Sequence, residues 1–390
     1  MATAKWRPTK LDELGHVGRG KSKHRPRNDA ILYGGRYPFF QTGDIKAANF
    51  YLTEYSQTYS EKGLAQSKLW KPGTLCITIA ANIAESAILG IEGCFPDSVV
   101  GFTPDTSKAD VRFIKYYLEI LKLRMQNISH GSTQDNLSLD KLLSFDFLVP
   151  PLPTQRRIAD ILSAYDELIE NSQRRINTLE AMARALYREW FVHFRFPGRE
   201  VSPLVTSTLG DIPKGWEVKK LFEVTTVNYG KNLPTKKLVE DGPYPVYGAA
   251  KVIGCYNEYT RETRTIICGC RGSVGELQIT KPLCFVTNNS FTFDPTHPDN
   301  FFWLFHTLKD RGLRDVIGGS AQPQITLDGI SSVELLTPPL PLRTSFKNIV
   351  SEMFEQAWVL DSQIENLRRT RDLLIPRLLS GQIEVKETVS

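Results

Sequence analysis

The chain has 390 residues, of which 41% are hydrophobic and 23% are charged, and its formal net charge is +5 at pH 7. These values are typical of an ordinary globular protein with two or three domains. No apolar run reaches the roughly 18 to 20 residues that a membrane span needs, and the first residues lack the apolar segment of a signal peptide, so we expect a cytoplasmic protein with no membrane partner. The mild positive charge permits a polyanionic partner without requiring one.

Residues 15–22 match the phosphate-loop pattern G-x4-G-K-S at every position. This pattern binds a nucleotide only when an apolar strand leads into the loop and a helix begins at its lysine. Residues 5–14, before the motif, do not form an apolar run, and the residues around Pro26, after it, resist helix formation. A nucleotidase therefore remains only an alternative. We instead predict that this stretch is a basic loop that binds a phosphate backbone. The alternative is a solvated basic loop without a partner. A second basic segment follows Gly230. The candidate phosphate contacts are Arg19, Lys21, Lys23, Arg25, Arg27, Lys231, Lys236 and Lys237.

Short apolar runs and helical spacings occur in both halves of the chain. Residues 75–80 and 265–268 are predicted to form buried strands, and residues 111–125 and 301–310 have helical spacing. We therefore predict α+β globular parts.

Motifs for a metal centre or an active site are missing from the sequence. The six cysteines form no Cys-x-x-Cys pair and have no histidine partner at zinc-finger spacing, so we predict buried thiols on strands and no metal site. The chain also has no G-x-S-x-G elbow, no H-E-x-x-H helix and no glycine-rich cofactor loop. These absences favour a binding protein over an enzyme.

Two long helices are predicted, each directly after a Pro-Pro-Leu-Pro segment. The first extends from Gln155 to about Phe191 with Thr154 as its N-cap, and the second extends from Leu342 to Ile375, where Pro376 is expected to end it. Both carry apolar residues at heptad spacing, which favours a pair that forms an antiparallel coiled coil. The alternative is that each helix packs only on its own domain. The predicted seam consists of Ile158, Leu162, Tyr165, Ile169, Ile176, Leu179, Leu186, Phe346, Val350, Met353, Leu360, Ile364, Leu367 and Leu374.

The two halves of the chain repeat each other. Residues 131–153 and 319–341 share Gly-Ser-x-Gln, Leu-Asp and Pro-Pro-Leu-Pro in the same order and with the same spacing. A repeat of this length indicates a duplicated domain and not a solenoid, and it predicts pseudo-two-fold symmetry. We place the boundaries at 1–150 for the first globular domain, 151–194 for its helix, 195–215 for a linker, 216–338 for the second globular domain, and 339–390 for its helix and tail.

This ordered set of motifs resembles the specificity (S) subunits of type I restriction-modification systems, the HsdS family, over the whole chain. The motifs are Trp-x4-Leu at Trp6 and Trp216, Gly-Ser-x-Gln before each Pro-Pro-Leu-Pro, and the ending at residues 373–381. One departure is that Thr154-Gln155 of the first copy corresponds to Leu342-Arg343 in the second.

The resemblance implies a non-catalytic DNA-recognition subunit. Each globular part would be a target recognition domain that reads one half of a bipartite, asymmetric double-stranded DNA target. The helices would set the gap between the halves and dock two adenine-methyltransferase subunits, which the restriction/translocase subunits would join. S-adenosylmethionine and ATP would be bound by those partners and no cofactor by this chain. The alternative class is a two-headed protein adaptor spaced by the coiled coil.

Polar residues near glycines are the candidates for base contacts, because Gln and Asn can form paired hydrogen bonds with adenine. An alternative is that Gly-Ser-x-Gln is a structural turn, since it recurs in modules that should read different sequences. The candidates are Gln41, Thr42, Ser132, Thr133, Gln134, Asn288, Asn289, Ser320, Gln322 and Gln324.

Overall fold

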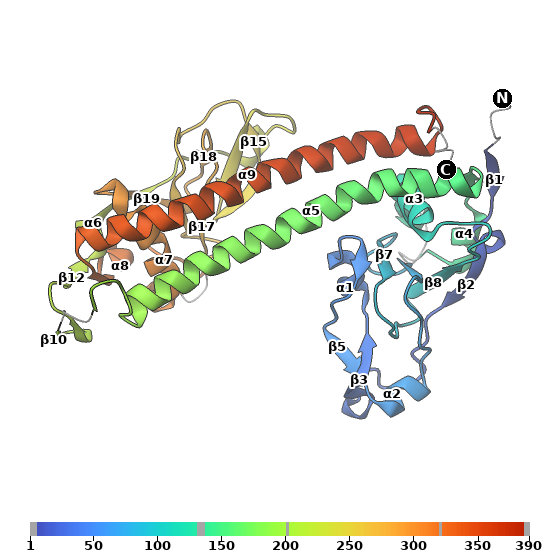
Figure 1. Cartoon of the computed structure of the whole chain (residues 1–390), viewed down its shortest axis with the longest axis horizontal. Coiled ribbons are helices and arrows are strands. Elements are labelled where there is room, and N and C mark those ends of the chain that lie inside the picture. Colours follow the sequence, from blue (N-terminus) through green and yellow to red (C-terminus); the bar gives the residue numbers. More distant parts are fainter. Residues whose placement is uncertain (1–5, 131–136, 200–202, 320–321, 386–390) are drawn as a thin grey trace. The chain divides into compact units, whose positions relative to one another are not determined.

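A computed structural model of the chain describes residues 6–130, 137–199, 203–319 and 322–385 (Figure 1). The chain divides into two compact units, one made of Met1–Arg174 and Leu360–Ser390 and the other of Arg175–Val359. Each unit therefore contains one globular module together with parts of both long helices. Among the described helices, none combines the length and the apolar character needed to cross a membrane.

The first module is built on a five-stranded sheet in the order β2-β8-β6-β7-β4. Its central strand β6 is buried at all four residues, as expected for an apolar strand covered on both faces. A small sheet pairs β3 with β5, and β1 pairs with β9, so the start of the module lies beside its end. The elements are β1 (Arg7–Thr9), β2 (Gly15–Arg19), β3 (Tyr33–Phe39), α1 (Thr42–Ala47), β4 (Tyr51–Leu52), β5 (Gln57–Tyr59), α2 (Glu61–Ala65), β6 (Leu75–Thr78), β7 (Ser86–Leu89), β8 (Val99–Pro104), α3 (Val111–His130), α4 (Leu139–Ser144) and β9 (Phe147–Val149).

The second module repeats this arrangement with the sheet order β13-β19-β16-β17 and a separate sheet β15-β14-β18. Strands β12 and β20 pair at its base as β1 and β9 do in the first module. The predicted linker contains a hairpin of β10 (Leu204–Ser207) and β11 (Gly210–Pro213). The remaining elements are β12 (Glu217–Lys220), α6 (Leu221–Val224), β13 (Thr225–Tyr229), β14 (Tyr244–Gly248), β15 (Lys251–Tyr256), β16 (Ile266–Gly269), β17 (Leu277–Ile279), β18 (Phe285–Val286), β19 (Ser290–Pro295), α7 (Phe301–Arg311), α8 (Leu327–Ser331) and β20 (Glu334–Thr337).

Backbone hydrogen bonds confirm the duplication. The amide of Thr78 donates to the carbonyl of Glu85, and at the matching place in the second module the amide of Gly269 donates to Glu276; both N–O distances are 2.9 Å. The amide of Gly20 donates to Val99 as the amide of Gly230 donates to Ser290. In the sequence, Thr, Glu and Ile have the same spacing at residues 74, 85 and 88 as at residues 265, 276 and 279. This spacing reflects one common turn between two paired strands, followed by the same chain path.

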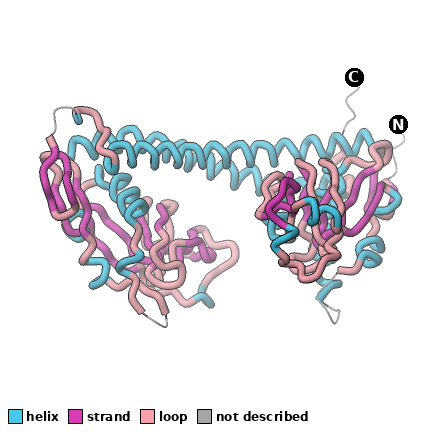
Figure 2. Tube along the Cα trace, turned by 90° about the horizontal axis from the view of Figure 1, so that it is seen from below, coloured by secondary structure: helices cyan, strands magenta, loops and turns pink. Residues whose placement is uncertain are grey.

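The cores of both units include residues from both long helices, α5 (Leu152–Tyr187) and α9 (Leu340–Leu379). In the first unit, the sheet and α3 pack with Ile158 of α5 and Leu378 of α9. In the second unit, α7 packs with Tyr187 of α5 and Phe346 of α9. Figure 2 shows each module's strands and loops beside its part of the helices. Helix α5 and helix α9 each contribute residues to the core of the first unit and to the core of the second unit.

Within each unit the two helices lie side by side and run antiparallel. The first turns of α5 share a core with the last turns of α9, and the end of α5 shares one with the beginning of α9 (Figure 1). None of the predicted seam residues is exposed; Ile158, Leu162, Phe346 and Val350 are completely buried. The seam pattern therefore marks the buried stripe of each helix.

The predicted helix ends were wrong at three positions. Helix α9 begins at Leu340, two residues before the predicted start at Leu342. Helix α5 begins at Leu152 and not after an N-cap at Thr154, because a proline in the first turn needs no N–H partner, which makes Pro153 compatible with the helix. Helix α9 continues through Pro376 to Leu379. A proline inside a helix costs about 3 kcal/mol, and burial of Leu378 and Leu379 in the core of the first unit offsets this cost.

The departure at Gln155 and Arg343 does not shift the second helix, since both α5 and α9 begin at the leucine of Pro-Pro-Leu-Pro. Gln155 accepts a hydrogen bond from the amide of Asp110 at 3.0 Å, just before α3. Arg343 donates to the side chain of Asn300, just before α7, and lies over the ring of Trp303. The two residues thus anchor the helices to the same place in each module by different chemistry.

Candidate nucleic-acid interface

The phosphate-loop pattern does not form a phosphate loop. Gly15–Arg19 is strand β2, which pairs antiparallel with β8. No helix follows; the chain continues through Gly20, which donates to Val99, and Lys21, which donates to Phe95. A Cβ on Gly20 would lie 2.3 Å from the carbonyl oxygens of Phe95 and Pro96, so the glycine of this motif permits close backbone packing and not phosphate binding.

The cations of the first basic segment divide into two groups. Arg27 forms an ion pair with Asp97 at 3.0 Å, and Arg25 donates to the carbonyls of Ser22 and His24. Arg19, Lys21 and Lys23 are exposed, and their side chains form no ion pair within the described part of the chain. All five cations are exposed, so the three without an internal partner are the ones most available to a phosphate backbone.

Lys68 joins this basic segment, although the sequence analysis did not single it out. Its ammonium lies 3.5 Å from the ring centre of Trp70, and partial burial and the nearby charge of Lys21 lower the pKa of Lys68. A long stretch of chain separates Lys21 from Lys68, so no local pattern connects them.

The second basic segment has the same placement. The amide of Lys231 donates to Val286 at 2.9 Å, as the amide of Lys21 donates to Phe95 in the first module. Lys21 and Lys231 therefore occupy equivalent positions after the first strand of the main sheet. Lys236 and Lys237 lie nearby in the sequence on an exposed 3-10 turn, Thr235–Lys237.

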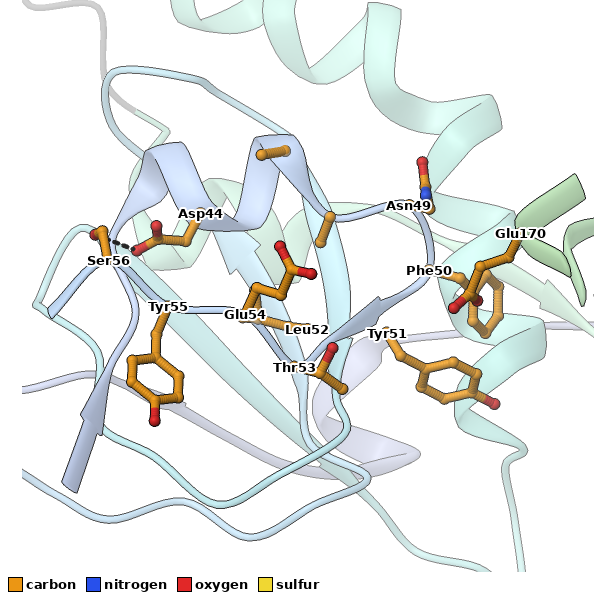
Figure 3. A pocket seen from close by; sticks show the side chains of 12 residues that line it. Asp44, Asn49, Phe50, Tyr51, Leu52, Thr53, Glu54, Tyr55, Ser56 and Glu170 are labelled. Atoms are coloured by element: carbon orange, nitrogen blue, oxygen red, sulfur yellow. Dashed lines mark hydrogen bonds between the residues drawn. The ribbon is translucent and has the colours of Figure 1, made fainter. Parts of the chain in front are cut away.

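Gln41 and Thr42 lie at the beginning of α1, beside an acidic pocket. Gln41 donates from its side chain to Gln57 at 2.7 Å, and its amide donates to Asp44. The pocket, of about 370 Å³, is lined by Asp44, residues 47–56 and Glu170, and three of its side chains, Asp44, Glu54 and Glu170, are carboxylates (Figure 3). Asp44 also accepts a hydrogen bond from Ser56, drawn as a dashed line in Figure 3. Carboxylates repel DNA phosphates, so this surface is the least suited of the candidate positions to DNA binding.

Several candidates for base contacts in the second module lie together. The carbonyl of Asn289 accepts hydrogen bonds from the amides of Cys270 and Arg271, and the carbonyl of Asn288 accepts one from the thiol of Cys270. Gln324 pairs with Arg271 in an isolated antiparallel bridge. Asn288, Asn289 and Gln324 are therefore neighbours around Arg271, a residue that the sequence analysis did not select. Its position three residues after the predicted buried strand 265–268 was the available signal.

The structure says less about the remaining candidates for base contacts. Ser132, Thr133, Gln134 and Ser320 lie outside the described residues. Gln322 is exposed in the loop between Gly318 and Gln324, whose backbones form two mutual hydrogen bonds. Gly319 has a φ of +87°, and a Cβ there would lie 2.4 Å from the carbonyl oxygen of Gln322. The glycine of Gly-Ser-x-Gln is thus required by the turn, which supports the structural interpretation for that position.

The cysteines are free, and five of the six are buried. Burial raises the pKa of the Cys268 thiol to about 12, so this thiol is protonated and unreactive at neutral pH. Within the described ranges, no group of three or more His, Cys, Asp or Glu side chains could hold a metal ion.

Comparison with known proteins gives a family and a fold. The family model described as "Type I restriction modification DNA specificity domain" matches residues 3–181 and 213–350. The MjaIX type I restriction enzyme specificity subunit of Methanocaldococcus jannaschii is 24% identical, over 98% of this chain and 94% of its own length. The HindI specificity subunit of Haemophilus influenzae is 24% identical, over 65% of this chain and 72% of its own length.

A solved structure supports the same fold. The crystal structure of a type I restriction-modification S subunit from M. genitalium superposes with a TM-score of 0.64 at 18% sequence identity, covering 97% of both chains. At this identity the likeness concerns the fold alone. The two-module architecture with long helices is therefore shared with that protein.

Proposed function

Because this chain belongs to the family of type I restriction-modification DNA specificity domains, we propose that each of its two modules reads one half of a bipartite, asymmetric DNA target. The observation that carries this proposal is that one backbone plan occurs twice with different side chains at equivalent strand ends. A shared frame presents both modules to DNA in the same way, and different side chains select different bases. The chain is the DNA-specificity component of its system and not a catalytic one.

The phosphate contacts come from the exposed cations at the strand ends. Lys21 and Lys231 occupy equivalent places in the two modules, and neither forms an ion pair among the described residues. Such contacts hold a protein in register on the duplex without reading its sequence.

The helices set the spacing between half-sites by pairing as an antiparallel coiled coil. Helix α5 has 36 residues, and a helix of that length extends about 54 Å at 1.5 Å per residue. One turn of DNA is about 34 to 36 Å long, so half-sites roughly a turn apart are within reach of modules attached to such a helix. The antiparallel contacts seen within both units support this role.

The partners are the methyltransferase and restriction subunits with which type I specificity subunits assemble. A duplicated module and helix arrangement offers two equivalent docking places, which suits two adenine-methyltransferase subunits. S-adenosylmethionine and ATP chemistry would then belong to the partner subunits, which act on host DNA in the cytoplasm.

The proposal is tested by co-expressing the chain with its cognate methyltransferase and mapping modified adenines in host DNA. The expected result is one asymmetric motif in two parts with a fixed gap. A stable complex with the methyltransferase that deposits no sequence-specific methylation would instead favour a two-headed protein adaptor.

A further inference from the structure

Four polar residues of the second module form a cluster at the end of strand β16. We call Arg271, Asn288, Asn289 and Gln324 the Arg271 cluster. They come from three separate stretches of chain: the turn after β16, the segment before β19 and the loop before α8. Asn289 accepts hydrogen bonds from the amides of Cys270 and Arg271 at 2.9 and 3.3 Å, and the carbonyl of Cys270 accepts one from Ile325 at 3.0 Å. The backbone therefore joins all three stretches around Arg271.

The side chain of Arg271 is exposed and only partly engaged. Its Nε donates to Oε1 of Gln324 at 3.4 Å. Among the described residues its two Nη groups have no hydrogen-bond or ion-pair partner, and no carboxylate neutralises the guanidinium. Gln324 thus orients the guanidinium group through Nε, while the two Nη groups stay free. A free, planar pair of N–H donors has the geometry that binds O6 and N7 of guanine.

The turn that carries Arg271 is tightly constrained. The amide of Gly269 donates to Glu276 and the amide of Gly275 donates back to Gly269, both at 2.9 Å. A Cβ on Gly269 would lie 2.2 Å from the carbonyl oxygen of Ser273, and Gly272 has a φ of +79°. Because the turn is closed from both sides, the backbone of Arg271 is held in one place, as a base-reading residue requires.

The first module has the same frame with different side chains. Ile79 donates to Ser98 and accepts from Leu137, as Cys270 donates to Asn289 and accepts from Ile325. This register makes Ala80 the counterpart of Arg271. In the same register Asp97 and Ser98 are the counterparts of Asn288 and Asn289.

The comparison of the two modules distinguishes side chains needed for folding from side chains available for DNA recognition. A side chain needed to form the turn would recur in both copies, as the hydrogen bonds do. The arginine and the two asparagines occur in the second module alone. Residues that change on an unchanged frame are those expected to distinguish two unlike half-sites.

We propose that Arg271, oriented by Gln324, recognises a guanine in the major groove of the half-site that the second module binds. This inference rests on the proposed DNA-specificity function and goes beyond it by naming the residue and the base. Lys231, whose carbonyl accepts a hydrogen bond from the amide of Asn288 at 3.1 Å, lies at the same strand end and contacts the neighbouring phosphate. The first module, with Ala80 at the equivalent position, does not read a guanine in this way.

The test uses the assembled complex of the full chain with its methyltransferase subunits. Binding is measured to the mapped target and to targets in which each guanine of the second half-site is replaced in turn. We expect Arg271→Ala to weaken binding to the intact target by about 5- to 150-fold and to abolish discrimination at one guanine position. Discrimination in the first half-site should not change. Arg271→Lys keeps the charge but loses the fork, so it should recover affinity without recovering discrimination.

Lys219→Ala is the matched control, because it removes one cation from the same module at an ion pair with Glu217 in the β12–β20 pair. It should leave discrimination at every position unchanged. If Arg271→Ala loses the same affinity for every DNA sequence, the residue contacts a phosphate and the inference is overturned. Unchanged binding by this variant would overturn it as well. If the unmutated complex itself fails to discriminate between DNA sequences, the proposed function fails, and this inference fails with it.

Discussion

Arg371 of α9 forms an ion pair with Asp166 of α5, 205 residues away in the chain. Arg371 lies four residues after Leu367 and three before Leu374, at a heptad position of the seam where an apolar residue is expected. Asp166 also accepts a hydrogen bond from the hydroxyl of Tyr116 on α3, so the pair connects both helices to the first module. Both charged side chains are largely shielded from solvent, with exposed fractions of 25% for Arg371 and 13% for Asp166.

Asp166→Asn should lower the free energy of unfolding by about 1.5 kcal/mol, because it removes one of the two carboxylates that pair with Arg371 and leaves the arginine only its more exposed partner Asp372. Replacing both residues by leucine should recover most of this loss. Chemical denaturation measures the effect, with Arg36→Ala as control, since Arg36 and Glu61 are mostly exposed and their pair should contribute less than about 1 kcal/mol. If the loss of stability in the double variant equals the sum of the losses in the two single variants, the two side chains do not stabilise each other.

Lys21→Ala and Lys231→Ala should each weaken DNA binding without changing the sequence that is recognised. Each removes one phosphate contact, so the slope of log affinity against log salt concentration should decrease by about 1. Arg27→Ala should have a smaller effect, because Arg27 is already paired with Asp97. Binding curves at several salt concentrations measure this, and an unchanged slope in both lysine variants would remove these residues from the interface.

A polar replacement of Leu360 and Ile364 by asparagine should loosen the preference for one gap between half-sites. Their side chains are 6% and 1% exposed, so asparagine would place amide groups in the buried stripe of α9. Methylation mapping of the variant should then find the same half-sites with more than one gap. An unchanged, single gap would refute the role of the helices in spacing.

His306 should make the second unit less stable in acid. Burial, followed by the charges of Lys309 and Arg184, lowers the pKa of His306 to about 3, and its Nε2 has no hydrogen-bond partner within the described chain. Below about pH 6.5 the unfolded chain binds a proton that the folded state does not accept, so stability decreases by about 1.4 kcal/mol per pH unit between pH 6.5 and 3.

His306→Phe should remove this part of the pH dependence. The ring of His306 lies among Tyr187, Phe346 and Phe354, a surrounding that accepts another aromatic ring. Thermal unfolding at pH 7 and pH 5 compares the two proteins. The same decrease in both would assign the acid sensitivity to other groups.

The repeated frame of the modules could be predicted because it depends on local requirements. The spacing from Thr74 to Ile88 and from Thr265 to Ile279 records one turn between paired strands, and glycine positions record close backbone contacts. Hydrophobic spacing likewise identified the buried stripes of α5 and α9. These features are visible in a single stretch of sequence.

The features that were missed depend on residues that are far apart in the chain. Pro376 remains helical because Leu378 and Leu379 pack into a core made mainly by the first module and the start of α5. Asp166, the more buried of the two partners of Arg371, lies on the other long helix. Arg271 became a candidate only when its backbone was seen beside Asn289 and Gln324. Tertiary packing decides such matters, and neither propensity nor spacing reports it.

The most direct test of independent half-site reading is a chain in which residues 216–338 are replaced by a second copy of residues 6–150. The chain would be co-expressed with its methyltransferase, complex formation would be verified, and modified adenines in host DNA would be mapped. If each module reads its own half-site, the methylated motif becomes palindromic, with both halves equal to the first half-site of the original target. A motif that keeps its original second half would contradict the account.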